Sequence, residues 1–364
     1  MESSKIKICI IIPNLKCGGS ERFISILCNH INTNKFLVEL YILDGANKFY
    51  EITNPEIKVT SFSIKNVRNS LFLIGSILRK TRPNILLTSA NHLNVFLAIF
   101  KSLFPREITF VARESSIVSI NNRQYSSIYD QIAKAFYKKI DFIICQSKFM
   151  QKDLIKNYQV RADKTIIIHN PVEETNYKPN INSTPSRISQ FKFISVGRLS
   201  KEKGIARILR ALCLLTLDFK FHIIGEGPEL QHLVELTNTL NLQGKIIFHG
   251  LKAMPYEGML DADLFLIGSF YEGFPNVLLE AGILGIPVVG FHAPGGISEI
   301  ISDGISGLLV SDDNTGEHFS AAIIKCLDMP RRRQLIIDNT RIRFSLEKIM
   351  DEVEFFFEKI HLKF

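Results

Sequence analysis

Two basic side chains, Arg198 and Lys203, lie in a loop that begins at Gly197 and ends at Gly204. The loop follows residues 191–196, an apolar segment typical of a buried strand, and a helical pattern comes after it. Such a strand-to-helix loop lies at the carboxyl edge of a parallel sheet, where α/β folds bind ligands. Two fixed cations there could neutralise the charge that develops on a leaving diphosphate. The alternative is a solvated basic loop.

Two carboxylates, Glu272 and Glu280, follow a second buried-strand pattern at residues 264–267. Pro275 suits the first turn of a helix, which leaves Glu272 in the loop and places Glu280 inside the helix. A carboxylate among apolar helix residues is costly unless it has hydrogen-bond donors, and ribose hydroxyls are suitable donors. Glu272, beside the flexible Gly273, could reach the hydroxyls of a sugar. The alternative is that both glutamates are ordinary surface residues.

Glycines follow two further predicted strands. Gly18 and Gly19 come after the first strand and open the first helix, and Gly225 and Gly227 repeat the arrangement in the second half. Glycine lets the backbone approach a ligand closely, and the free N–H groups of a helix start attract anionic or hydroxyl-rich groups. A plain tight turn is the alternative for the first pair.

Metal and disulfide chemistry find little support in the sequence. The six cysteines form no Cys-x-x-Cys pair and have no histidine at ligand spacing, which argues against zinc sites and disulfide frameworks. Asp261 and Asp263 imitate a metal-binding Asp-x-Asp motif, but they precede the apolar strand 264–267 and so lie at the wrong end of the sheet. We therefore predict no metal site and interpret this pair as a helix termination.

The chain has 364 residues, of which 46% are apolar and 22% charged, as in a globular protein with two α/β domains. Its most apolar stretch, residues 85–104, is interrupted by polar side chains, so we predict no membrane span. The apolar run 8–12 is only as long as a strand and lacks a cleavage site, which favours a cytoplasmic protein. The formal charge of +8 indicates either solvated helix faces or attraction to nucleotide phosphates or an anionic membrane surface.

Strand-like and helix-like segments alternate from end to end. Alternation of this kind predicts right-handed crossovers and a mainly parallel sheet with helices on both faces. The predicted strands are residues 7–12, 37–43, 58–64, 84–89, 109–112, 142–145, 165–168, 191–196, 219–224, 245–249, 264–267 and 286–290.

The polar, proline-containing residues 173–190 divide this series and are predicted to be a linker. We therefore predict an α/β fold of two Rossmann-like, doubly wound parallel-sheet domains, residues 1–172 and 191–342, that face a central ligand cleft. The amphipathic tail 343–364 is predicted to form a helix that packs back toward the first domain.

Four motifs span essentially the whole chain. They are Gly18-Gly19-Ser20-Glu21, the Gly197-Arg198-Leu199 segment with Lys203-Gly204, Gly225-Glu226-Gly227-Pro228, and Glu272 with Glu280. Pro287-Val288-Val289 and the Gly-Gly-x-x-Glu run from Gly295 to Glu299 add to the set. With these motifs the chain resembles the group-1 (family 4) glycosyltransferases of GT-B fold. The resemblance implies a retaining transfer without metal.

The resemblance also implies roles for individual residues. Arg198 and Lys203 would hold the diphosphate of the donor, and Glu280 would hold its ribose. Glu272 would contact the transferred sugar and, with the two cations, forms the candidate catalytic set. The other expected donor-binding residues are Gly18, Gly19, Gly197, Gly225, Gly227, Gly273, Phe274, Pro275, Asn276 and Val277.

The sequence departs from the family on the acceptor side. Many relatives carry a histidine near the reacting sugar where this chain reads Val111-Ala112-Arg113-Glu114-Ser115. Arg113 or Glu114 would replace that histidine, and His92, after an earlier strand, could also face the cleft. An ordinary polar loop role is the alternative for all three.

We thus expect a transferase that moves a hexose or N-acetylhexosamine from a UDP-linked donor, with no cofactor, to a glycan or lipid-linked glycan. The enzyme would work in the cytoplasm, with peripheral contact to an anionic membrane surface, and would bind no nucleic acid. Two alternatives remain open at this point. A nucleotide-sugar epimerase of related fold would consume donor without an acceptor, whereas a non-catalytic partner of an active transferase would bind nucleotide without turnover.

Overall fold

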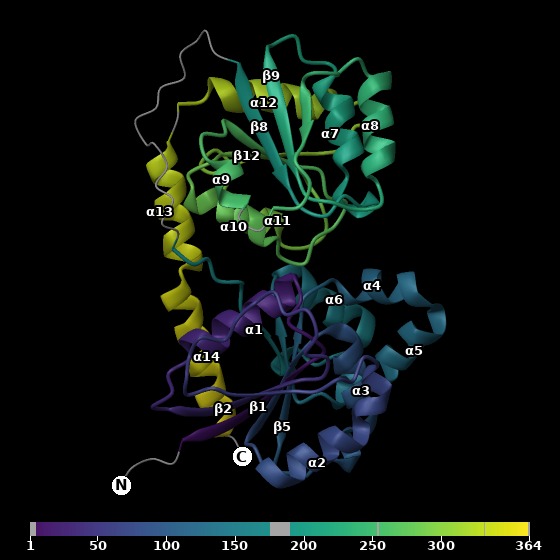
Figure 1. Cartoon of the computed structure of the whole chain (residues 1–364), viewed down its shortest axis with the longest axis vertical. Coiled ribbons are helices and arrows are strands. Elements are labelled where there is room, and N and C mark those ends of the chain that lie inside the picture. The colour runs from purple at the N-terminus through teal and green to yellow at the C-terminus, as the bar shows by residue number, and fades with distance from the viewer. Residues whose placement is uncertain (1–4, 175–189, 253–254, 331, 363–364) are drawn as a thin grey trace. The chain divides into compact units, whose positions relative to one another are not determined.

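The computed structural model describes residues 5–174, 190–252, 255–330 and 332–362 (Figure 1). Two compact units divide the chain. Unit 1 contains Met1–Pro171 together with Leu346–Phe364, and unit 2 contains Val172–Ser345. Residues 175–189, the greater part of the predicted linker, lie outside the described residues.

Unit 1 is built on a parallel sheet of seven described strands in the order β3-β2-β1-β4-β5-β6-β7. Its β-branched and aromatic runs form the strands, and its helices begin where polar or glycine residues follow a strand end. The elements are β1 (Ile6–Ile12), α1 (Gly19–His30), β2 (Phe36–Ile42), β3 (Lys58–Ser61), α2 (Leu71–Thr81), β4 (Ile85–Ser89), α3 (Asn91–Phe100), β5 (Thr109–Glu114), α4 (Val118–Tyr125), α5 (Ser127–Phe136), β6 (Phe142–Cys145), α6 (Lys148–Tyr158), β7 (Thr165–Ile167) and α14 (Leu346–His361).

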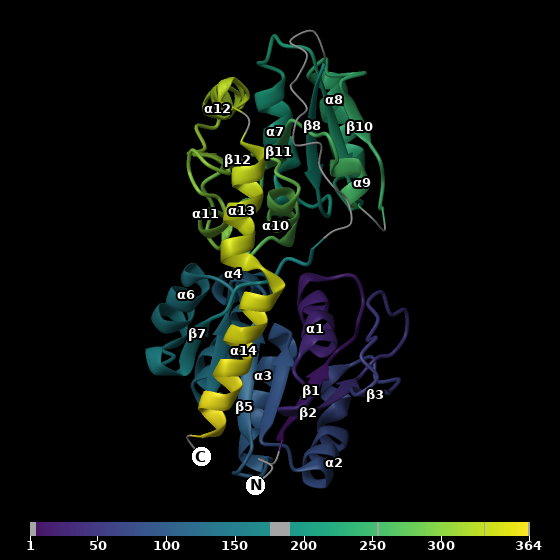
Figure 2. The same ribbon diagram turned by 90° about the vertical axis from the view of Figure 1, so that its left-hand side faces the viewer.

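The last helix completes the core of unit 1. Figure 2 shows α14 running along the strands of this unit. The ring of Phe357 meets that of Phe36 edge-on at 6.2 Å, and Phe356 meets Phe142 at 5.8 Å. At the helix surface, Glu358 pairs with Lys35 at 2.9 Å. The helix begins at Leu346 rather than at residue 343, because α13 extends to Phe344.

Unit 2 contains a parallel sheet of six described strands in the order β10-β9-β8-β11-β12-β13. Alternate residues of its central strands enter apolar clusters on opposite faces, so Phe193 packs on one side and Ile194 on the other. The elements are β8 (Phe191–Val196), α7 (Ile205–Leu212), β9 (Phe219–Ile224), α8 (Leu230–Thr239), β10 (Ile246–Phe248), α9 (Pro255–Met259), β11 (Leu264–Ile267), α10 (Asn276–Ile283), β12 (Val288–Phe291), α11 (Ile297–Ile300), β13 (Gly307–Val310), α12 (Glu317–Asp328) and α13 (Arg333–Phe344).

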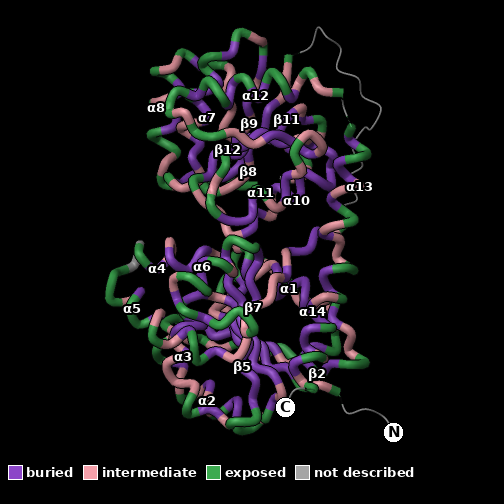
Figure 3. The backbone as a smooth tube through the Cα atoms, turned by 180° about the vertical axis from the view of Figure 1, so that it is seen from behind, coloured by how far each residue is buried: buried purple, intermediate pink, exposed green. Residues whose placement is uncertain are grey.

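The prediction of two parallel-sheet α/β domains is confirmed, and burial follows the strands in both units (Figure 3). Several details of the strands differ from the sequence expectations, and two of them bear on the site or the sheet edge. The edge strand β13 was not predicted, and β5 continues past residue 112 to include Arg113 and Glu114. Among the described residues, none of the helices combines the length and apolar character that crossing a membrane requires.

Candidate donor site and its supporting loops

The loop between β8 and α7 is fastened to the loop that follows β9. The N–H of Gly197 donates to the carbonyl of Ile224 at 2.9 Å, and the N–H of Leu199 donates to that of Glu226 at 2.9 Å. A methyl group on Gly225 would lie 1.9 Å from the carbonyl oxygen of Gly197, and one on Gly227 would lie 2.2 Å from that of Leu199. These glycines are therefore needed for the close approach of the two loops to each other.

Lys203 and Glu272 meet, although 69 residues separate them in the sequence. Lys203 ends a short 3-10 turn, Lys201–Lys203, and its ammonium group donates to Oε1 of Glu272 at 2.6 Å. Ser269 donates its hydroxyl to the same oxygen, also at 2.6 Å. Because β8 and β11 are neighbours in the sheet, the loops that follow them share one edge, and this brings the cation to the carboxylate.

Arg198 behaves differently from Lys203. Its side chain is exposed, and it makes no hydrogen bond or ion pair with any other residue in the described ranges. The structure thus presents one exposed guanidinium and one paired ammonium on the loop predicted to hold a diphosphate.

Another glycine, Gly295, shapes the backbone around Glu272. The N–H of Glu272 donates to the carbonyl of Pro294 at 3.0 Å, and Glu272 forms a parallel bridge with Gly295. Gly295 has a φ of +113°, and a methyl group there would lie 1.4 Å from the carbonyl oxygen of Glu272. Only glycine allows this contact, so Gly295 fixes the loop that presents the carboxylate.

Glu280 lies on α10 and is buried, with 5% of its surface exposed. Pro275 is the N-cap of this helix rather than a residue of its first turn, which Asn276 and Val277 begin. Phe274 is buried and packs edge-on against Phe344 at 5.6 Å. The predicted placement of Glu280 inside a helix and of Glu272 in the preceding loop is as the structure has it.

Sequence reasoning missed Arg207, which supports this loop from α7. Its guanidinium donates to the carbonyls of Gly268 at 2.7 Å and Ser269 at 2.5 Å. It also stacks on the ring of Phe270 at 4.1 Å, and its pKa is lowered, mainly by burial. Arg207 therefore holds the chain between β11 and Glu272. The only sequence signal was one arginine near the start of an apolar helix face, which is common and unspecific.

In unit 1, Gly18 is the N-cap of α1, and no side chain caps this helix start. A methyl group on Gly18 would meet the flexible carboxylate of Glu21 at 2.3 Å. The next residue after the glycine pair, Ser20, is buried and exchanges hydrogen bonds with Ser89 at the end of β4. His92 is the second residue of α3 and is exposed.

Arg113 and Glu114 do not lie in a loop, as the sequence suggested. They are the last residues of β5, and neither exposes any of its surface. Glu114 accepts hydrogen bonds from Asn94 and Tyr137, each at 2.6 Å, and burial raises its pKa to about 7. A direct contact with an acceptor is therefore closed to both side chains in this structure. Their hydrogen-bond partners are distant in the chain, so the local sequence could not predict their burial.

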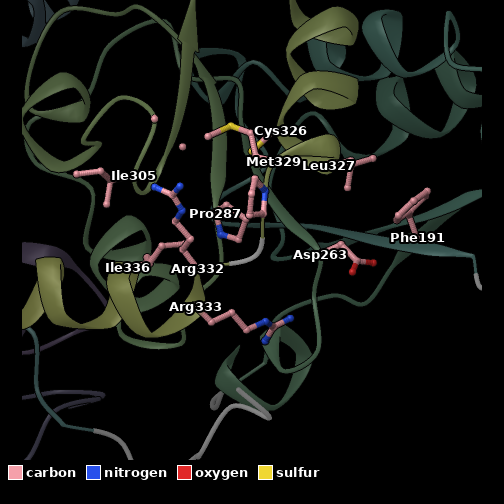
Figure 4. A pocket seen from close by; sticks show the side chains of 14 residues that line it. Phe191, Asp263, Pro287, Ile305, Cys326, Leu327, Met329, Arg332, Arg333 and Ile336 are labelled. Carbon is pink, nitrogen blue, oxygen red and sulfur yellow. The ribbon is translucent and has the colours of Figure 1, made fainter. Parts of the chain in front are cut away.

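The Asp261–Asp263 pair lies at the opposite edge of the sheet. Asp263 accepts from the backbone N–H of Lys192 at 2.7 Å, just before β11 begins. No group of three potential metal ligands (His, Cys, Asp or Glu) occurs in the parts of the chain that the structure describes. Figure 4 shows a pocket at this amino edge, with Asp263, Pro287 and Arg332 among its lining residues. It is separate from the loops at the carboxyl edge.

Two parallel-sheet α/β domains of this kind are the architecture of the GT-B fold. Solved structures of this kind share the architecture. The lipopolysaccharide outer core galactosyltransferase WaaB in its apo form has a TM-score of 0.76 at 21% identity, over 96% of this chain and 99% of that one. Anabaena Alr3699/HepE in complex with UDP-glucose has a TM-score of 0.76 at 20% identity, over 97% and 100%.

The chain belongs to the group-1 (family 4) glycosyltransferases. Residues 17–176 match the model "Glycosyltransferase Family 4", and residues 178–343 match "Glycosyl transferases group 1". A Campylobacter jejuni protein named N-acetylgalactosamine-N,N'-diacetylbacillosaminyl-diphospho-undecaprenol 4-alpha-N-acetylgalactosaminyltransferase is 28% identical over 335 residues, covering 86% of this chain and 88% of that protein. The Escherichia coli lipopolysaccharide 1,6-galactosyltransferase is 26% identical over 208 residues, 55% of each chain.

Proposed function

We propose that this glycosyltransferase moves a hexose or N-acetylhexosamine from a UDP-linked donor to a glycan or lipid-linked glycan during surface polysaccharide synthesis. The observation that carries the proposal is the meeting of Lys203 and Glu272 beside the exposed Arg198, at the carboxyl edge of the unit 2 sheet. The names of the relatives support the acceptor class, because they include a diphospho-undecaprenol and a lipopolysaccharide transferase. The donor class is supported by the UDP-glucose complex of a protein with the same fold.

The reaction that suits these residues is a front-face substitution with retention and without metal or cofactor. The bond between the anomeric carbon and the donor phosphate breaks, and the acceptor oxygen bonds to that carbon on the same face. The acceptor proton passes to the departing phosphate oxygen. Arg198 and Lys203 stabilise the negative charge that develops on the diphosphate. Glu272 orients Lys203 and accepts from sugar hydroxyls, while Glu280 accepts from the ribose.

A lipid-linked acceptor would place the enzyme at the cytoplasmic face of a membrane. The formal charge of +8 supports attraction to anionic lipid. Sedimentation with vesicles that contain phosphatidylglycerol tests this part of the proposal. Failure to bind at low ionic strength would speak against it.

The donor and the reaction are tested together with a panel of nucleotide sugars. Each is screened for thermal stabilisation of the protein, and the donors that stabilise it are then incubated with glycan acceptors in the presence of EDTA. We expect transfer to continue with chelator and the new linkage, read by proton NMR, to keep the donor's anomeric configuration. Loss of turnover on chelation would overturn the metal-independent mechanism, and donor consumed without acceptor would indicate an epimerase.

The role of the two cations is tested with Lys203→Ala and Arg198→Ala. Removing a group that stabilises charge in the transition state typically costs about 3–4 kcal/mol, so each variant should lower kcat by roughly two orders of magnitude or more. Lys201→Ala is the matched control, because Lys201 is an exposed cation in the same 3-10 turn. Near-normal turnover in either test variant, or an equal loss in the control, would contradict the assignment.

A further inference from the structure

The charge of Arg113 is buried inside unit 1, at the carboxyl end of β5. Burying a guanidinium is costly unless its N–H groups find partners. One terminal nitrogen donates to Asn170 at 2.5 Å, and the other donates to the hydroxyl of Ser89 at 3.3 Å. The flat face of the group lies over the ring of Phe23 at 3.8 Å. Three segments of unit 1 thus converge on one side chain.

A chain of hydrogen bonds continues from Arg113 to the start of α1. The Ser20 hydroxyl donates to the backbone carbonyl of Ser89 at 2.8 Å, and the two serine hydroxyls lie 2.7 Å apart. A hydroxyl group has only one hydrogen to donate. Because Ser20 donates its hydrogen to the carbonyl of Ser89, the hydroxyl of Ser89 must be the donor in the contact between the two hydroxyls. The oxygen of Ser89 then accepts from Arg113. The order of donation is therefore fixed, and the charge at its head strengthens the chain.

Arg113 holds α1 at two points that are one turn apart. Ser20 is reached through Ser89, and Phe23, three residues later on the same helix face, is reached by stacking. Gly18 is the N-cap of this helix and Gly19 is its first residue, and no side chain of the N-cap residue caps the helix start. The direction of the N–H groups at this helix start is thus set by the residues that hold the first turn in place.

We propose that Arg113 is a positioning residue, which through Ser89 and Ser20 fixes the helix start at Gly18 and Gly19, the glycine pair that the resemblance to the family assigns to the donor. This inference rests on the proposed function. It gives Arg113 a task that needs no contact with substrate, in agreement with its complete burial.

The test compares two serine variants on the same helix. Ser20→Ala breaks the hydrogen-bond chain at its last link. Ser25→Ala is the matched control, because Ser25 is also a buried residue of α1 and its hydroxyl donates to the carbonyl of Glu51 at 3.0 Å. Ser20→Ala removes the two hydrogen bonds of the Ser20 hydroxyl, and Ser25→Ala removes the hydrogen bond of the Ser25 hydroxyl to Glu51, both on the same helix. We expect Ser20→Ala to raise the KM for donor about tenfold, while Ser25→Ala leaves it unchanged and both keep the wild-type KM for acceptor.

Equal donor KM values for the two serine variants would overturn the inference. If the wild type binds no nucleotide sugar at all, the proposed function fails instead, so the two failures are distinguishable. Thermal unfolding of both variants shows whether a change in KM follows from a general loss of stability. A purely structural role for Ser20 would lower the melting temperature and leave the donor KM at the control value.

Arg113 itself is tested with Arg113→Lys, which keeps the charge but cannot bridge Ser89 and Asn170 at once. We expect a donor KM at least as high as that of Ser20→Ala. In the double variant the two effects should not add, because both changes interrupt one chain. Fully additive effects would show that Arg113 and Ser20 act independently, and they would contradict the proposed chain of hydrogen bonds. If Arg113→Lys fails to fold by circular dichroism, the serine comparison decides the question.

Discussion

Glu272 holds the ammonium group of Lys203 at 2.6 Å in this structure. Part of the pair is open to solvent, with 29% of the lysine side chain and 11% of the glutamate side chain exposed. Solvent screens the charges of an ion pair that is partly exposed, so in the proposed reaction a diphosphate would compete with Glu272 for the lysine. In the proposed reaction, the carboxylate would keep Ser269 as a donor when the lysine turns to the diphosphate.

Glu114 should make the stability of the protein depend on pH. Burial, opposed by hydrogen bonds from Tyr137 and Asn94 and by the charge of Arg113, raises its pKa from 4.5 to about 7. The folded state therefore binds the proton more tightly than the unfolded state. The contribution of Glu114 to stability is greatest below pH 4.5 and falls as the pH rises toward 7, by up to about 3 kcal/mol.

Glu114→Gln removes this dependence. Urea unfolding of wild type and variant between pH 4.5 and 8 should give free energies whose difference shifts in favour of the variant as the pH rises, and becomes constant above about pH 7. Parallel curves across the whole range would show that Glu114 does not titrate there.

At the scale of single residues, the sequence predicted the position of some side chains and gave no sign of the position of others. The loops that carry Lys203 and Glu272 could be placed at one sheet edge, because each follows an apolar strand, but the contact between the two side chains was not predicted. Arg113 could not be placed in the same way. A charged residue after a short apolar run is typical of a loop, and only Asn170 and Ser89, distant in the chain, permit its burial.

At the scale of elements, the turn between β8 and α7 depends on Gly204. This residue has a φ of +62°, and a methyl group there would lie 1.8 Å from the carbonyl oxygen of Gly268. Gly204→Ala should therefore lower the free energy of unfolding by about 2–5 kcal/mol, from backbone strain and overpacking together, and weaken donor binding by displacing Lys203. Chemical denaturation and titration with UDP measure the two effects.

Gly244 provides the control for this substitution. Its φ is +75°, but open space surrounds the position of an added methyl group. Gly244→Ala should cost only the strain of the left-handed backbone, about 1–2 kcal/mol, with UDP affinity unchanged. Equal effects of the two substitutions would mean that contact with Gly268 is unimportant.

Most strands could be predicted from their apolar runs, whereas β13 could not. It contains four residues, Gly307–Val310, and begins with a glycine whose φ is +156°. Its place comes from pairing with β12, where a methyl group on Gly307 would lie 2.0 Å from the carbonyl oxygen of Val288. A short run with a glycine has too weak a periodicity to distinguish a strand from a loop.

At the scale of the whole molecule, unit 1 depends on a helix that is distant in the sequence. Phe357 is fully buried in its core, and Phe355 on the same helix is 66% exposed. Phe357→Ala should lower the free energy of unfolding of unit 1 by about 3–5 kcal/mol, while Phe355→Ala, the matched control, stays within about 0.5 kcal/mol. Hydrogen exchange should show lost protection in β1 and β2 and unchanged protection in β8 and β9. An equal loss of hydrogen-exchange protection in both sheets would contradict the expectation that Phe357 stabilises unit 1 alone.

The position of α14 also affects how the chain folds during its synthesis. A ribosome releases the chain from its amino end, so residues 172–345 emerge as one continuous piece that can close on itself. Unit 1 still lacks part of its core at that time, since the stretch from Pro171 to Leu346 takes on the order of 10–30 s to translate. Unit 1 is therefore synthesised first but completes its core last. Until α14 has been made, the apolar surface on which α14 packs is open to chaperones.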